Sequence, residues 1–524
     1  MTTPPLSRPT LGLLAIGALA LALATHALTL RFALQPGDYA LLRPFTQGES
    51  LAVLSGPWAA ADSGLGAYYR PAAAILFGGL FEILGVHARW LHALALLEVA
   101  AVIWFAALFA AREGGVRAGI VTGLLFAVHP LLPGAASVSA GALATLTSLA
   151  LAGLALLRWQ RARTDLRLLA WWPIFALIGI GTFVREDLIV LAPALLLLQW
   201  WRARNIGDVR PPNVAVVAGA VATLVGVGAI RAAAFPHLPL LANGAPALLS
   251  QLVAALTGAA HAVAARAAAS PLSVVASVVA VIGTALMLGA VLWAAAAVAR
   301  TPSAPATPIA HTGAVLVLAF TLPLLIDPSR TEARLPFLVF AAALLAGAGI
   351  ITLLERLPAF PAAFALVVVA TPLAWSQHVQ MRDYLAPCHG GNTVTLLPTP
   401  PVAGEARASA CTSGLEAPLD EQMPVMQWSA GPRRVIWLAR DAQSVTFSLT
   451  PPASLTGDVE IHVDVDGASH TAVLHPDART RLTYRLRSSF LQRARGGHWI
   501  DLRTDTDMDL PLATDVSVVW SNGR

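Results

Sequence analysis

The chain has 524 residues, of which 56% are hydrophobic and only 12% are charged, and its mean hydropathy is +0.68. A soluble domain carries about 25% charged residues, so this composition excludes an ordinary soluble fold and indicates a polytopic membrane protein. The net charge of +5 and the pI near 9.8 do not indicate nucleic-acid binding. The arginines are scattered over short loops between apolar runs and form no basic patch.

The first apolar run extends from about residue 11 to 30, behind Arg8. It is longer than the core of a signal peptide, which is about 7–15 residues, and predicts an uncleaved anchor that runs outward. A long polar loop follows over residues 31–89. Within this loop, segment 72–86 is apolar but short, and we expect it to form a helix at the membrane surface.

Apolar runs of about 20 residues, the length that spans a bilayer, recur as far as residue 376. With segment 72–86 at the surface, the arginine-rich loop 158–167 faces inward, as the positive-inside rule requires. If that segment crossed the membrane, the same loop would face outward. The later crossings are expected at 90–111, 118–131, 136–157, 168–184, 187–201, 213–233, 271–299, 312–326, 336–354 and 358–376. The prediction is thus an all-α domain over residues 1–380 with about 11 spans, its N-terminus inside and its C-terminus outside, and a second surface helix at 245–268.

After residue 380 the composition changes. Residues 381–432 are rich in Pro, Gly, Ser and Thr and predict an irregular linker. Residues 433–524 then show short alternating runs separated by turns, which predict a small antiparallel β-sandwich outside the membrane. Strands are expected at 435–438, 444–449, 459–465, 471–474, 482–486 and 516–520. Cys388 and Cys411 lie in the linker, where the alternatives are a disulfide and two free thiols.

This topology brings charged groups from distant segments to the outer face, whereas the inner face shows arginines and almost no acids. Ionisable groups at membrane depth are costly, so they tend to be functional. The outer-face groups are Asp38, Glu49, Asp62, Arg70, His129, Arg185, Glu186, Asp187, Arg330, Glu332 and Arg334.

These residue types suit a transfer reaction onto a hydroxyl group. A carboxylate takes the proton of the attacking hydroxyl, and Asp38 is the predicted base. Guanidinium groups pair with the oxygens of a lipid-phosphate leaving group, and the predicted partners are Arg70, Arg330 and Arg334. The groups expected to contact substrate or to support the site are Glu49, Asp62, Tyr69, His129, Arg185 and Glu186. No metal-ligand spacing is present, and we predict neither a metal nor a cofactor.

Each assignment has a structural alternative. For Asp38, the alternative is a cap for a helix that begins near Tyr39. For Arg70, the alternative is a side chain that only places its charge at the membrane interface. For Arg330 and Arg334 the alternative is a role as interfacial anchors, and for His129 it is a position at the end of a helix. For Arg185, Glu186 and Asp187 the alternative is a structural ion pair that closes a helix hairpin.

Several short motifs together resemble the membrane-embedded C-type glycosyltransferases, and among them the protein O-mannosyltransferase-like branch. They are Asp38-Tyr39, Tyr69-Arg70-Pro71, Leu80 to Gly85, Leu91 to Leu94, Leu125 to Pro130, Val184-Arg185-Glu186 and Arg334-Leu335-Pro336. The resemblance covers roughly residues 10–376. It implies a polyprenyl-phosphate sugar donor, an inverting mechanism, and an acidic base in the first outer loop, which corresponds to Asp38.

The resulting expectation is a plasma-membrane (inner-membrane) glycosyltransferase acting at the periplasmic face. Its partners would be a polyprenyl-phosphate sugar, a protein or cell-envelope glycan acceptor, and membrane lipids. Mannose is one candidate sugar. One alternative is a transporter or flippase of lipid-linked sugars, although a transporter would place its ionisable groups near the bilayer midplane. Another is a non-catalytic envelope scaffold, because Gly37-Asp38 stands where such enzymes often carry two adjacent acids.

Overall fold

The chain forms two compact units, and each is described by itself. The first comprises residues 1–29, 93–138 and 142–384, and the second comprises 30–92, 139–141 and 385–524. The computed structural model describes residues 6–31, 70–84, 88–129, 132, 141–207, 209–234, 285–286, 289–293, 296, 307–326, 331–355, 358–385, 425–430, 433–439, 442–451, 455–466, 468–476, 478–486, 497–504 and 513–520.

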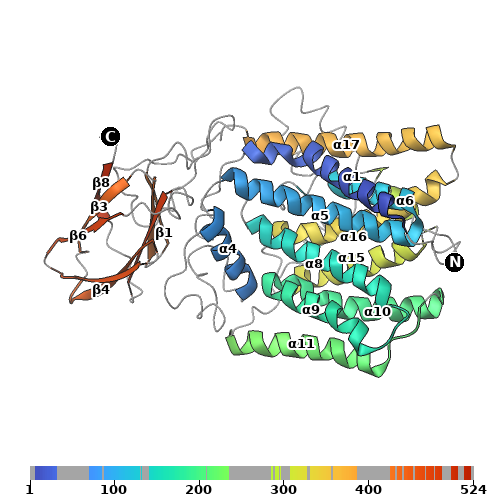
Figure 1. Cartoon of the computed structure of the whole chain (residues 1–524), viewed down its shortest axis with the longest axis horizontal. Helices are drawn as coiled ribbons and strands as arrows, with labels where there is room; N and C mark the ends of the chain where they lie inside the picture. The colour runs from blue at the N-terminus through green and yellow to red at the C-terminus, as the bar shows by residue number, and fades with distance from the viewer. Residues whose placement is uncertain are drawn as a thin grey trace. The chain divides into compact units, whose positions relative to one another are not determined.

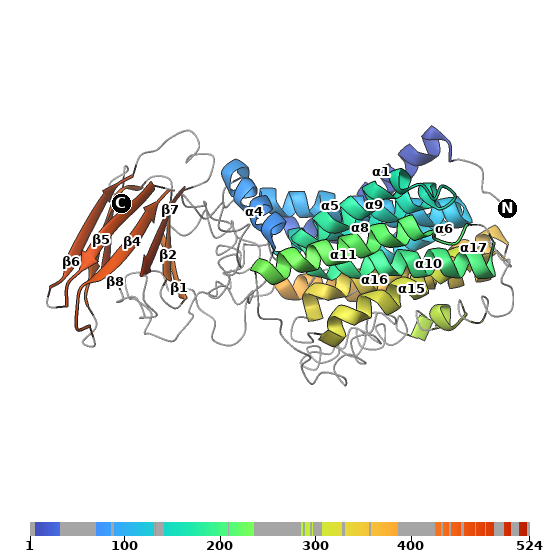
Figure 2. The same ribbon diagram turned by 90° about the horizontal axis from the view of Figure 1, so that it is seen from below.

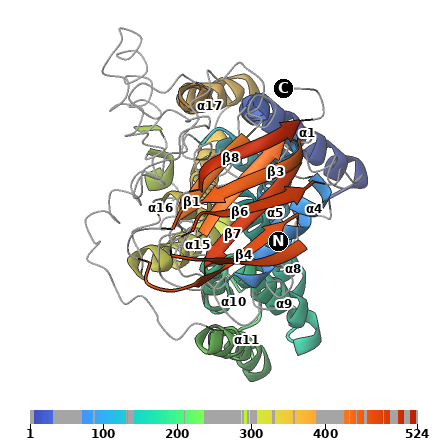
Figure 3. The same cartoon turned by 90° about the vertical axis from the view of Figure 1, so that its left-hand side faces the viewer.

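The first unit is a bundle of helices that lie alongside one another (Figure 1). They are α1 (Arg8–His26), followed by the 3-10 turn η1 (Ala27–Arg31), α5 (Ala88–Gly114), α6 (Val116–Ala127), α8 (Gly141–Ala162), α9 (Leu168–Val184), the 3-10 turn η2 (Glu186–Val190), α10 (Leu191–Asn205), α11 (Val214–Ala234), α15 (Thr307–Ile326), α16 (Thr331–Leu354) and α17 (Ala359–Leu385). Helix α4 (Pro71–Leu84) belongs to the second unit. In the bundle, α11 lies at one edge, and α17 and α1 lie at the opposite edge (Figures 1 and 3).

Local sequence explains where several helices begin and turn. Ser7 caps α1 by accepting a hydrogen bond from the backbone N–H of Thr10, and Asn213 caps α11 in the same way through Val216. Such side chains satisfy N–H groups that the first helical turn leaves unpaired. Helices α5 and α6 are joined by Gly115 alone, at a φ of 85°. This left-handed conformation favours glycine and turns the chain into an antiparallel hairpin.

Side-chain contacts fix the direction of each helix. Glu113 near the end of α5 contacts Arg163 after α8 and Arg202 near the end of α10, so these three helices run in the same direction. At the opposite end, Arg185 after α9 contacts Thr145 near the start of α8. We call these two ends of the bundle the Glu113 end and the Arg185 end.

Contacts of α1, α6 and α17 show at which end of the bundle α1 ends. Gln377 of α17 contacts His26 at the end of α1 and Ala127 at the end of α6. Because α5 and α6 are antiparallel, α1 ends at the end of the bundle where α5 begins. The surface position of segment 72–86, most of which forms α4, stays a prediction.

Small residues allow close contact between these helices. A Cβ built on Gly119 of α6 would lie 2.6 Å from the carbonyl oxygen of Ala107 in α5, and one on Gly313 of α15 would lie 2.7 Å from the backbone nitrogen of Leu345 in α16. Membrane helices associate through such packing, because lipid gives no hydrophobic driving force between them.

Five of the described helices are long and apolar enough to cross a membrane: Arg8–Leu30, Arg89–Gly114, Ala142–Ala162, Val214–Ala233 and Pro336–Leu354. Shorter apolar helices cover Pro71–Leu80, Val116–Ala127, Leu168–Val184, Thr307–Pro323 and Leu366–Trp375. Within the first unit, Figure 2 shows the longer helices α5, α8 and α16 alongside the shorter helices α6, α9 and α15. The predicted surface helix 245–268 and most of the predicted crossing 271–299 lie outside the described residues.

The C-terminal part is a sandwich of two antiparallel sheets. One has the order β1-β2-β7-β4-β5 and the other β6-β3-β8, with β3 and β8 visible side by side in Figure 3. The strands are β1 (Val425–Ala430), β2 (Arg433–Ala439), β3 (Ala442–Leu449), β4 (Val459–Val465), β5 (Ala468–Leu474), β6 (Thr480–Arg485), β7 (Gly497–Thr504) and β8 (Ala513–Trp520).

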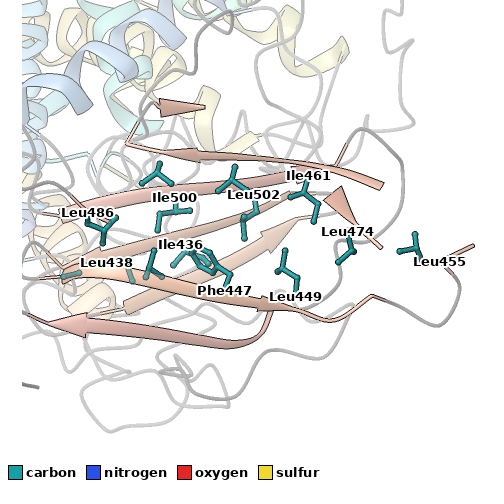
Figure 4. Close-up of a cluster of buried hydrophobic side chains, with 14 residues drawn as sticks. Ile436, Leu438, Phe447, Leu449, Leu455, Ile461, Leu474, Leu486, Ile500 and Leu502 are labelled. Carbon is teal, nitrogen blue, oxygen red and sulfur yellow. The ribbon is translucent and has the colours of Figure 1, made fainter. Parts of the chain in front are cut away.

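Alternate residues of the strands form the core of this sandwich. Ile461, Val463 and Val465 of β4 are buried in this core, as are Ile500 and Leu502 of β7. Figure 4 labels Ile461, Ile500 and Leu502 among the side chains of the cluster. A strand places every second side chain on one face, so the alternating pattern leads directly to a two-layer fold. The predicted fold class, a polytopic α-helical domain with a C-terminal β-sandwich, is confirmed. Helix α17 and strand β1 extend into the two ends of the segment 381–432 that was predicted to be a linker.

Candidate functional site

Many predicted site residues lie outside the described part of the chain. They are Asp38, Glu49, Asp62, Tyr69, Arg330, Cys388 and Cys411. Arg334 lies in the first turn of α16, where the backbone but not the side chain is described. The geometry below therefore concerns Arg70, His129, Arg185 and Glu186 among the predicted residues.

Arg185 is held at the end of the bundle by groups from two helices. Its Nε donates to Asp187 Oδ2 at 2.9 Å, and its Nη1 donates to the hydroxyl of Thr145 in α8. The guanidinium also lies 5.9 Å from the ring centre of Phe337 in α16. The side chains of Arg185 and Asp187 are only 4% and 5% exposed, so this is a buried ion pair.

The chain breaks at Arg185 for a local reason. Helix α9 ends at Val184, and Arg185 adopts an extended conformation with φ −152° and ψ 117° before η2 begins. The preceding Gly181 packs closely against Leu188, leaving no room for a side chain. This reversal places the carboxylate of Asp187 beside the guanidinium two residues earlier.

Glu186 faces a different partner. Its Oε2 lies 3.4 Å from Nη2 of Arg231, near the end of α11, and both side chains are partly buried. Two adjacent ion pairs and the hydrogen bond from Arg185 to Thr145 therefore join α8, α9, η2 and α11 at the Arg185 end. The predicted alternative of an ion pair that closes the hairpin is present in the structure, through Asp187 rather than Glu186.

A second buried polar group lies where α1, α6 and α17 meet. Gln377 Nε2 donates to the carbonyl of Ala127 at 2.8 Å and lies 3.3 Å from His26 Nε2. His129, two residues after Ala127, is fully buried. Its backbone N–H donates to the carbonyl of Phe126 and its own carbonyl accepts from Leu132, so His129 occupies the turn that ends α6.

Arg70 belongs to the second unit. Its carbonyl accepts a hydrogen bond from Ala74 N–H at 3.0 Å, which places Arg70 at the start of α4.

The expectation that the opposite face would show almost no acids is wrong for the Glu113 end. Glu113 accepts hydrogen bonds from Gln160 Nε2 at 2.8 Å, Arg163 Nη1 at 2.8 Å and Arg202 Nη2 at 3.0 Å. Asp165 is also paired there, and hydrogen bonds from Arg167 lower the pKa of this carboxyl to about 2. Both carboxylates neutralise arginines, so the charge count of a loop does not show which groups are paired.

Sequence reasoning missed several of these residues. Glu98, Glu113, Thr145, Arg202 and Arg231 were not assigned roles, although Glu98 is the one Asp, Glu, Lys or Arg between Trp90 and Ala111. An ionisable residue in such an apolar run is itself a signal of function. In the described part of the chain, no group of three or more His, Cys, Asp or Glu side chains could hold a metal ion.

The Arg185 end has chemical properties that suit an anion. Among the residues that the structure describes, Arg185 Nη2 has no hydrogen-bond partner. Nε and Nη1 are fixed by Asp187 and Thr145, so the orientation of the planar guanidinium is set before any ligand arrives. Such a pre-oriented group pairs well with phosphate or carboxylate oxygens.

These features define an integral membrane protein whose helical bundle carries buried charges at both ends and is followed by a β-sandwich. Neither a protein-family model nor a curated protein sequence matches the chain. Solved structures do show partial likeness. The oligosaccharyltransferase of Archaeoglobus fulgidus shares 13% identity at a TM-score of 0.44, over 71% of this chain and 55% of that one.

Two further similar structures are also transferases or bind lipid phosphate by name. ArnT from Cupriavidus metallidurans, bound to undecaprenyl phosphate, shares 12% identity at a TM-score of 0.40 over 71% of this chain and 76% of that one. The arabinosyltransferase EmbB from Mycobacterium smegmatis shares 12% identity at a TM-score of 0.35 over 98% and 66%. At these scores the likeness assigns no activity, so function has to be inferred from the residues of this chain.

Proposed function

We propose that the protein is a membrane glycosyltransferase that moves a sugar from a polyprenyl-phosphate donor to a hydroxyl of a protein or cell-envelope glycan. Transfer occurs at the Arg185 end of the bundle, on the periplasmic side of the inner membrane, with inversion at the anomeric carbon. Mannose is one candidate sugar. The supporting observation is the fixed guanidinium of Arg185 at the end of an apolar bundle.

The energetic cost of Arg185 supports a functional role. Removing two charges from water costs several kcal/mol per ion, and apolar residues of similar volume often stabilise a protein equally well or better. Helix packing alone would therefore not require an arginine at this position. A lipid phosphate, whose charge lies at the membrane interface while its chain lies in the bilayer, suits a cation held at the end of a helical bundle.

The roles of the other residues follow from the chemistry of the transfer. The acceptor hydroxyl needs a base, which we assign to Asp38. The departing lipid phosphate needs cationic partners, which we assign to Arg70, Arg330 and Arg334. Glu49, Asp62, Tyr69 and His129 contact substrate or support these groups. In this assignment Arg185 orients the phosphate, and the Glu186–Arg231 pair holds α11 against η2.

The test is a transfer assay with purified protein in lipid vesicles, supplied with a panel of polyprenyl-phosphate sugars and envelope acceptors. We expect wild-type protein to release polyprenyl phosphate as sugar appears on the acceptor. The Asp38→Asn variant should lose about 100-fold or more in turnover, the usual contribution of a general base. Arg204→Ala, which changes an exposed residue at the Glu113 end, serves as the matched control.

The same vesicles separate this proposal from its alternatives. A flippase would move a fluorescent lipid-linked sugar between leaflets without forming product. A scaffold would do neither. Turnover that is unchanged in Asp38→Asn would overturn the assignment of the base, and the absence of transfer with every donor would overturn the proposed function.

A further inference from the structure

Helix α5 carries two glutamates in opposite electrostatic settings. Glu113, at its end, accepts hydrogen bonds from two guanidinium groups and one amide. Glu98 lies about 22 Å away along the helix axis, at about 1.5 Å per residue. It therefore lies deep within a span whose mean hydropathy is 2.3.

The carboxyl group of Glu98 has one bonding partner among the described residues. The Thr147 hydroxyl of α8 donates to Glu98 Oε1 at 2.6 Å. Glu98 Oε2 is buried, and in the described part of the chain it has no hydrogen-bond partner. No described cation forms an ion pair with either oxygen.

Helices α5, α6 and α8 supply no countercharge near Glu98 in sequence either. Helix α6, which packs against α5 at Gly119 and Gly123, has Arg117 as its one charged residue, in its first turn. Helix α8 has no charged residue from Gly141 to Leu157. On α5 the nearest titratable or charged groups are His92 on one side and Arg112 with Glu113 on the other. Thr145, which holds Arg185, is two residues from Thr147 and so lies on the far side of α8 at about 100° per residue.

The protonation state of Glu98 follows from comparing the free energy of its hydrogen bond with the cost of burying its charge. A hydrogen bond to a charged group contributes about 1.5–3 kcal/mol. Burial of an unpaired charge costs at least several kcal/mol, so a single hydroxyl cannot offset it. A neutral carboxyl avoids this cost, and its carbonyl oxygen can accept the same hydrogen bond from Thr147.

We propose that Glu98 is a proton-binding site within the membrane, where it is a neutral carboxylic acid at neutral pH. This inference does not depend on the proposed sugar transfer. The proton keeps a negative charge out of the apolar contact between α5 and α8, where Thr147 donates to Glu98. A neutral acid in an apolar setting is also the group that a lipid-soluble carbodiimide modifies.

The modification step needs no additional reactant. The carboxyl proton moves to one nitrogen of dicyclohexylcarbodiimide, and the carboxylate oxygen bonds to its central carbon. The resulting O-acylisourea rearranges by an oxygen-to-nitrogen acyl shift to a stable N-acylurea. All atoms of both molecules are retained, so the adduct is found by the mass added to the peptide.

The experiment treats the full-length protein in lipid vesicles with dicyclohexylcarbodiimide at neutral pH and maps the adducts by mass spectrometry. We expect modification of Glu98 and none of Glu113, because Glu113 is ion-paired with Arg163 and Arg202. Glu98→Gln should abolish the adduct. A water-soluble carbodiimide should not reach Glu98, which distinguishes a site in lipid from one exposed to water.

A second measurement covers the case in which the reagent is excluded by packing. Gln resembles a neutral carboxyl, so Glu98→Gln should leave the thermal unfolding temperature unchanged, whereas Glu113→Gln should lower it. Labelling of Glu98 that falls about tenfold or more between mildly acidic and neutral pH would show a titration in that interval. That result, or equal destabilisation by the two glutamine variants, would overturn the proposal.

Discussion

Arg202 Nη2 donates to Glu113 Oε2 at 3.0 Å, although 89 residues separate the two in sequence. Arg202 is completely buried, and its guanidinium lies 5.3 Å from the ring centre of Trp159. Because Arg163 bonds to the same carboxylate, one acid joins α5, α8 and α10. This network fixes the relative direction of the three helices at the Glu113 end.

Removing that acid should destabilise the bundle. Glu113→Gln removes the carboxylate that pairs with the buried Arg202 and the partly exposed Arg163, and breaking a buried pair costs about 3–5 kcal/mol. We expect a clear drop in the thermal unfolding temperature of the protein in detergent. Glu355→Gln, at an exposed residue after α16, is the control and should change stability by no more than about 0.5 kcal/mol.

Thr145 should act on the proposed reaction through Arg185. Thr145→Val removes the hydroxyl that holds Nη1, so we expect turnover to fall by about tenfold, which corresponds to about 1.4 kcal/mol. Arg185→Lys should cost more, because lysine lacks the planar fork. Effects on turnover that simply add in the double variant would contradict a shared mechanism.

A matched control for this prediction lies in α16. Thr352→Val removes a hydroxyl that bonds only to carbonyls of its own helix. This variant should leave turnover unchanged. Equal losses in Thr352→Val and Thr145→Val would indicate a general effect on helix stability.

Substitution by alanine should lower the stability of the protein at one glycine and not at another. Gly313→Ala would place a Cβ 2.7 Å from the backbone nitrogen of Leu345, and such overpacking costs about 1–3 kcal/mol. Gly226 of α11 has no neighbouring atom within 4 Å of a built Cβ, so Gly226→Ala should not destabilise the protein. Thermal unfolding of both variants in detergent is the measurement, and equal losses would contradict the observed packing.

The orientation of the bundle is testable by cysteine labelling. Exposed arginines gather at the Glu113 end: Arg117, Arg158, Arg161, Arg167, Arg204 and Arg210. The positive-inside rule therefore predicts that this end faces the cytoplasm. In a Cys388→Ser and Cys411→Ser background, an impermeant maleimide should label the Ala233→Cys variant in intact cells and spare the Thr164→Cys variant. The reverse pattern would invert the predicted topology.

The helices were predictable because length and apolarity are local properties. The predicted run 168–184 coincides with α9, and most other segments differ only by a few residues at their ends. Segment 187–201 was taken as one helix, but the structure divides it between η2 and α10. Arg185 is extended at this break, and Gly181 packs closely against Leu188 beside it; local hydropathy reveals neither feature.

Two strands were missed for different reasons. Strand β7 buries His498, Ile500 and Leu502, and also Asp501. Its sequence looks polar because His498, Asp501 and Arg503 interrupt the apolar residues. Strand β1 was assigned to the linker because it lies within 381–432, a segment rich in Pro, Gly, Ser and Thr. Its pairing with β2, from Val425 with Leu438 to Ala430 with Arg433, becomes visible only in the sheet.

The sequence by itself determined that the chain is a membrane protein of many helices with a β-sandwich at its end. These properties depend on runs of neighbouring residues, since bilayer thickness sets helix length and the strand repeat sets alternation. Only the tertiary structure decided that Arg185 meets Thr145, that Glu113 joins Arg163 to Arg202, and that Glu98 has a hydroxyl as its partner. Such pairings depend on which helices become neighbours and how each is rotated, and no local pattern encodes either.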